Sequence, residues 1–550
     1  MRAKHFSLVL HSHIPYVLAH GSWPHGMDWL FEAAAESYLP LLDVFERLRD
    51  EGTPPRVNIS FTPVLMEQLK SSSFATGFME YLRMKIEIAR RDRSYFEKTG
   101  AKPLLALTEY WEGWYSGLLE SFSGRHQQDI LGAFRKLQDD GQLEVLTSAA
   151  THGYLPLLSK DDSIRWQARQ GRYVYEKYFG RKPTGFWLPE CAYRPGYAWR
   201  SPLGDHETED RSGVDEILSE EGLGCFFVDT HLLSGGEAKG VYLDRFPALK
   251  LLWEKFKKEY QPGQETAKTP YLPYLAYPSR VPFLARDEKS GTQVWSGKTG
   301  YPGDGWYLEF HKKHFPGGMR YWRITAGDAD LGDKLPYDPE RVRERLEENA
   351  GHFVASLQES LKDREEVAVV ALYDTELFGH WWFEGPEWLY LVLKKLQQTE
   401  VRSQTVSGCL EALHPHTLIS LPEGSWGKGG FHWIWLNDDT AWIWEKIYAV
   451  EKEAARLKSL PPAKDPRILK QFCREKFLLE SSDWPFLIST WTARDYSENR
   501  AAEHFERART LLEWIKRAGP LIPDQMKLLE TWEEEDQLFS EVVTPDGRII

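Results

Sequence analysis

Short apolar runs alternate with longer amphipathic stretches along roughly the first two-thirds of the chain. Strand–helix alternation predicts an α/β fold with parallel strands joined by right-handed crossovers. Seven strands fit a β/α barrel short of the usual eight, although an open doubly wound sheet fits the same alternation. The predicted helices are Phe74–Arg91, Gln128–Asp139, Ile164–Tyr178 and Pro339–Leu361. The runs with the β-branched and aromatic content of buried strands are His5–Leu10, Val57–Thr62, Leu143–Thr147, Thr184–Pro189, Gly224–Asp229, Thr292–Trp295 and Val367–Tyr373.

The runs are unevenly spaced, and this divides the chain into parts. Residues 191–223 contain several Pro and Gly and one charged helical piece, which indicates an excursion above the barrel. Residues 234–282 form a second long connection, of the kind that often serves as a lid or binding loop. From residue 399 the pattern becomes amphipathic and predicts a C-terminal helical domain over 399–550. The barrel then comprises residues 1–190 and 224–398.

The composition narrows the class of protein. Hydrophobic residues make up 42% and charged residues 27%, which is typical of a globular chain. The 82 acidic residues outnumber the 68 basic ones, and a net charge of −14 argues against a nucleic-acid partner. No apolar stretch has membrane-spanning length and no signal-peptide pattern is present, so we expect no membrane partner. The four cysteines show no CxxC spacing, which favours reduced thiols and a cytoplasmic location.

Aromatic residues are unusually numerous. The chain has 23 Trp, 25 Tyr and 27 Phe, more than a core alone would need. We expect part of this set to fill the core. The rest is expected to provide stacking surfaces for sugar rings, whose C–H faces pack on aromatic rings.

Two of the predicted strands end in a carboxylate. Glu190 closes the fourth run and Asp374 follows the seventh. In a β/α barrel, polar residues just past the strand ends lie on the catalytic face. Two carboxyl groups about 5–5.5 Å apart on that face would cleave a glycosidic bond with retention, and we expect neighbouring strands to bring them together. Alternatively, Glu190 caps the next helix and Asp374 belongs to an ion pair.

Histidines gather at the same strand ends. His11 and His13 close the first run, His152 follows the third, and His380 lies beyond Asp374. Alternation along a strand places His11 and His13 on one side. Such a group can bind zinc, and it can equally donate hydrogen bonds to sugar hydroxyls.

Several tryptophans lie among turn-forming residues. Trp295 precedes a Gly-rich turn that contains Asp304, and Trp426 and Trp435 lie in a Gly-rich segment after residue 420. Tryptophans in such loops predict subsites where sugars stack. Asp483 lies between two helical segments, where an N-cap is the simpler interpretation.

Four ordered motifs resemble those of glycoside hydrolase family 57. They are His11–Tyr16, His152–Pro156, Gly185–Gly196 and Tyr373–Trp382. The stretches 295–305 and 425–437 are similar to features of the branching enzymes within that family. The matches extend from residue 5 to about residue 500, and several ordered motifs over such a span are more specific than any single one.

The resemblance implies an incomplete (β/α)7 barrel, a helical subdomain inserted at 191–223 and the C-terminal helical domain. It implies a retaining reaction without metal or cofactor, with Glu190 as nucleophile and Asp374 as general acid/base. The implied substrate is an α-1,4-glucan such as amylose or a glycogen-like chain, re-formed with α-1,6 branches. The predicted substrate-binding residues are His11, His13, Trp29, His152, Tyr242, Trp295, Asp304, Trp426, Trp435 and Asp483, with Tyr242 covering the site from the 234–282 loop.

Other functions fit the same residues. An α-amylase or a 4-α-glucanotransferase would use the same two carboxylates. A glucan-binding protein without catalytic activity would use only the aromatic surfaces. A zinc-dependent deacetylase would use the His and Asp cluster as metal ligands.

Overall fold

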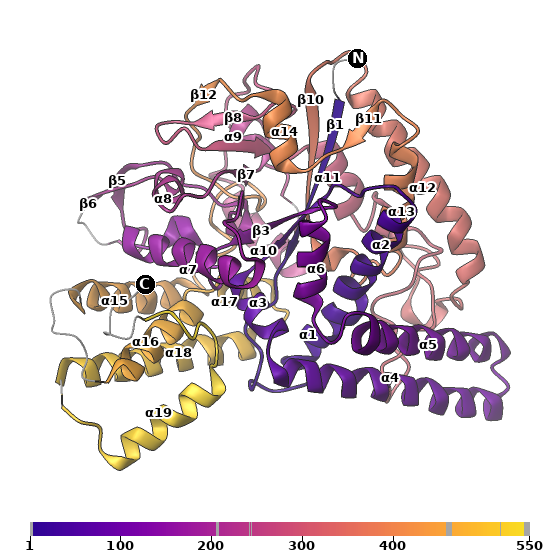
Figure 1. The fold of residues 1–550 in the computed structure, drawn as a ribbon, viewed down its shortest axis with the longest axis horizontal. Helices are drawn as coiled ribbons and strands as arrows, with labels where there is room; N and C mark the ends of the chain where they lie inside the picture. The colour runs from indigo at the N-terminus through magenta and orange to yellow at the C-terminus, as the bar shows by residue number, and fades with distance from the viewer. Residues whose placement is uncertain are drawn as a thin grey trace.

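Seven parallel strands form the centre of the computed structural model, which describes residues 4–204, 208–240, 242–243, 245–457, 465–517 and 519–543 (Figure 1). The sequence predicted six of these strands. In the order in which they pair across the sheet, they are β10 (Val367–Asp374), β1 (Lys4–Ser12), β2 (Asn58–Phe61), β3 (Glu144–Ser148), β4 (Phe186–Trp187), β7 (Phe226–Val228) and β9 (Pro282–Ala285).

The strand order decides between the two folds that the sequence allowed. From β1 to β9 each parallel strand is added beside the previous one, and β10 returns to the free side of β1. A doubly wound sheet would reverse direction at a switch point, and this sheet does not. Beyond β9 the sheet continues into β8 (Tyr274–Ala276) and β12 (Leu418–Ile419). The molecule is therefore an incomplete (β/α)7 barrel, as predicted.

Helices surround the curled sheet, and the four helices predicted from the sequence are confirmed. Asp338 caps α12 by accepting hydrogen bonds from the backbone of the first helical turn, and Pro339 stands at the first position. The helices around the barrel are α1 (Met27–Ala33), α2 (Leu39–Asp50), α3 (Pro63–Leu69), α6 (Ile130–Asp139), α7 (Asp161–Phe179), α9 (Thr230–Ser234), α12 (Pro339–Ser360), α13 (Gly385–Leu396) and α14 (Val406–Leu413).

A long helical hairpin projects from one side of the barrel. It consists of α4 (Ser72–Thr99) and α5 (Lys102–Glu120), which lie side by side at the lower right of Figure 1. The left-handed backbone of Gly100, with φ of +72°, ends α4 and allows the tight reversal. The sequence predicted the middle of α4 but not this arm.

The predicted strand at 292–295 is wrong. These residues form the last turn of α11 (Glu288–Trp295). Asp287 accepts a hydrogen bond from Ser290 N at 2.7 Å and so starts the helix. The apolar Val294 and Trp295 face the core from a helix, and the missing strand is β9, ten residues earlier in the chain.

Residues 191–223 were expected to form a helical subdomain, and this is also corrected. The described part of this segment contains a β-hairpin, β5 (Tyr197–Arg200) paired with β6 (Thr208–Arg211), and one short helix, α8 (Val214–Glu220). Arg211 fixes the hairpin to the barrel by an ion pair with Asp161 at 2.6 Å.

The C-terminal boundary lies later than residue 399. The strand β11 (Val401–Ser403) pairs with β1, so the chain returns to the barrel sheet before it leaves. The helical domain proper follows, as predicted, and lies at the lower left of Figure 1. Its helices are α15 (Ala441–Leu457), α16 (Pro466–Leu479), α17 (Asp483–Thr490), α18 (Arg494–Arg517) and α19 (Pro523–Glu535).

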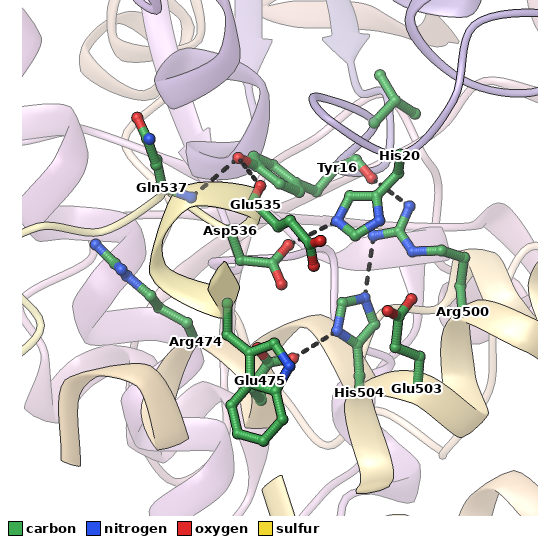
Figure 2. A network of polar contacts seen from close by, with 12 residues as sticks. Tyr16, His20, Arg474, Glu475, Arg500, Glu503, His504, Glu535, Asp536 and Gln537 are labelled. Carbon is green, nitrogen blue, oxygen red and sulfur yellow. Dashed lines mark hydrogen bonds and ion pairs between the residues drawn. The ribbon is translucent and has the colours of Figure 1, made fainter. Parts of the chain in front are cut away.

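A buried polar network joins this domain to the loop after β1 (Figure 2). His20 Nε2 lies 2.8 Å from Asp536 Oδ1, and Arg500 donates a hydrogen bond to the backbone oxygen of Tyr16 at 2.8 Å. His504 connects Arg500 to Glu475, at 3.0 and 2.7 Å. The network fixes α16 and α18 against the segment that follows the first motif.

Candidate active site

Glu190 and Asp374 lie at the carboxyl ends of β4 and β10, on the same end of the barrel. The expectation that neighbouring strands carry them is wrong, because β1, β2 and β3 lie between those two strands. The curl of the sheet turns the two strand ends toward each other across the barrel mouth. The charge of Glu190 acts on Asp374, so the two carboxyl groups interact although their strands are not adjacent.

Glu190 is buried, and three side chains donate hydrogen bonds to its carboxylate. Oε2 accepts from Tyr242 at 3.0 Å and from Trp426 Nε1 at 2.9 Å, while Oε1 accepts from Ser482 at 3.3 Å. The backbone of Glu190 has a φ of +61°, a strained conformation for a residue with a side chain. Burial raises the pKa of Glu190 to about 7, and the Trp426 and Tyr242 donors oppose this rise.

Asp374 is the last residue of β10 and pairs in register with His11 of β1. It keeps some exposed surface. Burial, then the charges of Glu376 and Glu190, raise the pKa of Asp374 well above its ordinary range, and Arg245 opposes this.

The phenol of Tyr242 interacts with both carboxyl groups. Burial raises its pKa, and the charges of Glu190 and then Asp374 raise it further. The two carboxyl groups therefore share one electrostatic environment around Tyr242. When two carboxyl groups interact and hold one proton between them, the ionised group can act as nucleophile and the protonated group as proton donor.

The histidines of the motifs form a stacked group beside this pair. His11 Nε2 lies 3.0 Å from His152 Nε2, and His13 stacks on His152 with ring centroids 4.2 Å apart. The N-cap interpretation of Asp483 is wrong, because Ser482 is the N-cap of α17 and Asp483 is its first residue. His13 Nε2 lies 2.8 Å from Asp483 Oδ2 instead. His11 stacks on Trp187 at 4.6 Å.

A cleft of about 1070 Å³ adjoins the residues around the pair, although neither Glu190 nor Asp374 is part of its wall. Its wall includes Arg245, which acts electrostatically on Asp374, and Trp295, which packs against Tyr242. Trp381 forms another part of the wall and lies 4.9 Å from the Arg245 guanidinium. A larger groove of about 1470 Å³ between α2, α5 and α12 is lined by neither carboxylate. Of these two, only the 1070 Å³ cleft has a wall residue, Arg245, that acts on Asp374, and it is therefore the candidate substrate cleft.

Comparisons with known proteins place this arrangement in a family. The sequence matches the model of glycosyl hydrolase family 57 over residues 7–422, which is most of the chain. The chain belongs to glycosyl hydrolase family 57. Residues 445–545 match the C-terminal region of 1,4-alpha-glucan branching enzymes.

Individual members of family 57 resemble the chain over nearly its full length. A 1,4-alpha-glucan branching enzyme of Thermococcus kodakarensis is 42% identical, covering 98% of this chain and 78% of the relative. The crystal structure of that enzyme has a TM-score of 0.88 at 40% identity, covering 99% and 96% of the two chains. The α-amylase AmyC of Thermotoga maritima has a TM-score of 0.79 at 28% identity, covering 98% of each chain.

The predicted stacking residues of this family-57 chain have different surroundings from those expected. Trp295 is almost buried and lines the cleft. Trp426 was expected to stack on sugar, but it is 1% exposed and donates to Glu190 instead. Trp435 is fully buried and stacks on Tyr154 at 4.5 Å, so the expectation of a sugar platform there is corrected.

Two further predicted residues lie outside the group around the carboxylates. Trp29 packs against His25 and Tyr496, with ring centroids 5.0 and 5.7 Å apart. Asp304 accepts two hydrogen bonds from Arg345, at 3.0 and 2.6 Å, and holds α12. The contacts of these residues are structural.

The sequence interpretation did not single out several members of the site. Glu376 accepts hydrogen bonds from Tyr38 and from the backbone N of His13, and its charge acts on Asp374. Arg245 and Ser482 come from the long loop and from the α16–α17 junction. Glu376 belongs to the fourth motif, two residues after Asp374, which was the available signal.

Two groups of side chains in the described residues have metal-like spacing, and both lie away from the carboxylate pair. They are Asp43, Glu46 and His126, and Glu475, His504 and Asp536. Arg125 pairs with Asp43 at 2.8 Å and Arg507 pairs with Asp536 at 2.8 Å, so each group already holds a cation of the protein. His380, another zinc candidate, lies 2.7 Å from Glu36. In the parts of the chain that the structure describes, no helix is long and apolar enough to cross a membrane.

Proposed function

We propose that this protein is a 1,4-α-glucan branching enzyme, which transfers segments of an α-1,4-glucan onto a 6-hydroxyl. The observation that carries the proposal is the pair of Glu190 and Asp374: the pKa of each carboxyl group is raised, and the charge of each acts on Tyr242. The Thermococcus kodakarensis relative, a 1,4-alpha-glucan branching enzyme, supports it. A probable branching enzyme of Mycobacterium tuberculosis, 29% identical over 97% of this chain, supports it as well.

In the proposed mechanism, Glu190 attacks the anomeric carbon and forms a β-glucosyl ester. Asp374 donates its proton to the departing 4-oxygen, which its raised pKa favours. Asp374 then takes the proton of the incoming hydroxyl, and that oxygen displaces Glu190. Two displacements retain the α configuration.

We propose that the acceptor decides between branching and hydrolysis. When water attacks the ester, the product is a shorter glucan; when a 6-hydroxyl attacks, the product is a branch. Tyr242, which packs edge-to-face against Trp295, Trp426 and Phe486, would cover the ester against water. Its loop is held at Gly240, where an added Cβ would lie 2.4 Å from Lys428 N.

The glucan would bind in the cleft lined by Arg245, which acts on Asp374. Trp295 and Trp381 offer rings in its wall. His13 and Asp483 would bind hydroxyl groups at the reacting sugar. All four cysteines are buried and unpaired, which favours a reducing compartment, and we place the reaction in the cytoplasm, in the synthesis of glycogen-like storage glucan.

An α-amylase is the second candidate, because AmyC has the same fold along nearly its whole length. The test incubates the pure protein with amylose and analyses the products before and after a debranching enzyme. New α-1,6 linkages and a falling iodine absorbance are expected. Reducing ends without new branches would show a hydrolase and overturn the proposal.

A further inference from the structure

A chain of hydrogen-bonded side chains ends at Glu190. Ser60 Oγ of β2 lies 3.2 Å from His11 Nδ1, and His11 Nε2 lies 3.0 Å from His152 Nε2. His152 Nδ1 lies 2.8 Å from Ser482 Oγ, and Ser482 donates to Glu190 Oε1 at 3.3 Å. All five residues are at most 6% exposed.

The two imidazoles determine the direction of the chain. Burial lowers the pKa of His11, and His152 and His13 lower it further. Burial and then His13 lower the pKa of His152, while Asp483 opposes this, and the net shift of each ring is well below its ordinary value, so both rings are neutral. A neutral imidazole carries one N–H and one acceptor nitrogen. Because the two Nε2 atoms face each other, only one of them carries hydrogen. That choice determines whether Nδ1 of each ring is a donor or an acceptor.

One direction satisfies Glu190 and the other does not. If His11 Nε2 is the donor, His152 carries its hydrogen on Nδ1, donates to Ser482, and leaves the hydroxyl hydrogen of Ser482 for Glu190. If His152 Nε2 is the donor, its Nδ1 accepts the hydroxyl hydrogen of Ser482. Glu190 Oε1 then faces a lone pair of Ser482 Oγ and receives no hydrogen bond from it. An ionised Glu190 therefore favours the first direction.

We propose that Ser482 is a positioning residue for Glu190, oriented by the His152 and His11 pair. It would hold the carboxylate ionised and aim it at the anomeric carbon. Ser482 belongs to the junction of α16 and α17, so the C-terminal helical domain completes the nucleophile's environment. The inference rests on the proposed role of Glu190 as nucleophile.

Other groups also act on Glu190, and the experiment must allow for them. Tyr242 donates from the long loop, and Asp374 faces it from β10. Asp483 of α17 raises its pKa and His13, after β1, lowers it. Cys191 adjoins it in the chain and is buried. Loss of the Ser482 donor alone removes one hydrogen bond to the charged form.

The test compares Ser482→Ala with Ser482→Thr, which keeps the hydroxyl, and with Ser489→Ala. Ser489 is a buried serine of α17 that donates a hydrogen bond to Ile434 O and accepts one from Asn437. Infrared titration follows the Glu190 carboxyl, identified by the band missing from Glu190→Gln. We expect Ser482→Ala to raise the pKa of Glu190 by about 0.5–1 unit, and the other two variants to leave it within about 0.2 unit.

Kinetics provide a second readout. In Ser482→Ala, kcat/KM for amylose should fall about three- to tenfold when measured one pH unit below the pKa of the acidic limb of the wild-type profile. Most of the loss should be in kcat, because Ser482 is 1% exposed and so does not contribute to substrate binding. An unmoved Glu190 titration in Ser482→Ala, or an equal shift in Ser489→Ala, would overturn the inference. If the wild type forms no branches, the proposed function fails, while the infrared titration still decides the role of Ser482.

Discussion

Tyr242 donates its phenolic hydrogen to Glu190 Oε2 at 3.0 Å. This single contact links the long loop after β7 to the short helical turn that follows β4. The same ring packs against Trp295 and Trp426, so it also closes one side of the site. Its hydroxyl and its ring therefore have separable effects.

Two substitutions separate these effects. Tyr242→Phe keeps the ring and removes the donor, so we expect kcat to fall about tenfold with an unchanged ratio of branching to hydrolysis. Tyr242→Ala also removes the cover and should admit water, so the hydrolysed fraction should rise several-fold. Both fractions are measured from reducing ends and from chains released by debranching. An unchanged product ratio in Tyr242→Ala would contradict the proposed role of the ring.

The pH dependence of the reaction follows from the two raised pKa values. The proposed mechanism requires Glu190 ionised and Asp374 protonated, and the pKa of Glu190 is raised to about 7. We expect kcat/KM to increase with pH through about 7 and to decrease at higher pH, where Asp374 loses its proton. Because the two groups interact, both limbs belong to the pair. A plateau extending down to about pH 5 would contradict the account.

The pH dependence of stability that Glu190 causes should have the opposite sign to its effect on activity. Its pKa is higher in the folded state, so folded protein binds the proton more tightly, and stability is lost as pH rises through about 7. Glu190→Gln cannot ionise and should be more stable than wild type at pH 8 by up to about 3 kcal/mol, with little difference at pH 5. Thermal unfolding at both pH values measures this.

The matched control is Asp438→Asn, because the Asp438 side chain is 97% exposed and should change stability little at either pH. Equal effects of the two substitutions would contradict the burial argument.

The network in Figure 2 should contribute strongly to stability. Burial alone would raise the pKa of Asp536, but His20 and the neighbouring cations hold it below its usual range. Asp536→Asn removes the buried carboxylate that pairs with His20 and, together with Glu535, with Arg507, and we expect a loss of about 3–5 kcal/mol by chemical denaturation. This contribution is present above about pH 4 and is lost as pH falls through the folded pKa.

Glu506→Gln provides the comparison on α18, the helix that carries Arg507. Glu506 forms an exposed pair with Arg509, and its loss should cost less than about 1 kcal/mol. Equal costs for the two substitutions would show that the Asp536 network adds nothing beyond a surface ion pair.

The sequence predicted the barrel well because strand and helix periodicities are local properties. It failed at 292–295, where the side chains favour a strand but the Asp287 cap starts a helix. It also failed at β4 and β10, because the pairing of distant strands is not encoded in local pattern.

The site was predicted in part for a related reason. Glu190, Asp374 and the histidines stand in ordered motifs at strand ends, where sequence position indicates location. Ser482 and Arg245 reach the site by tertiary packing of a separate domain and a long loop. Trp426 and Trp435 were correctly seen as unusual, but sequence cannot separate a buried hydrogen-bond donor from a stacking surface.

The central claim is that Glu190 forms a covalent bond to sugar while Asp374 transfers the proton. The most direct measurement traps the intermediate with a slow fluorinated α-glucosyl substrate and identifies the modified peptide by mass spectrometry. We predict one glucosyl adduct, on Glu190, that accumulates further in Asp374→Asn and is absent from Glu190→Gln. An adduct on another residue, or turnover in which the anomeric configuration inverts, would contradict the account.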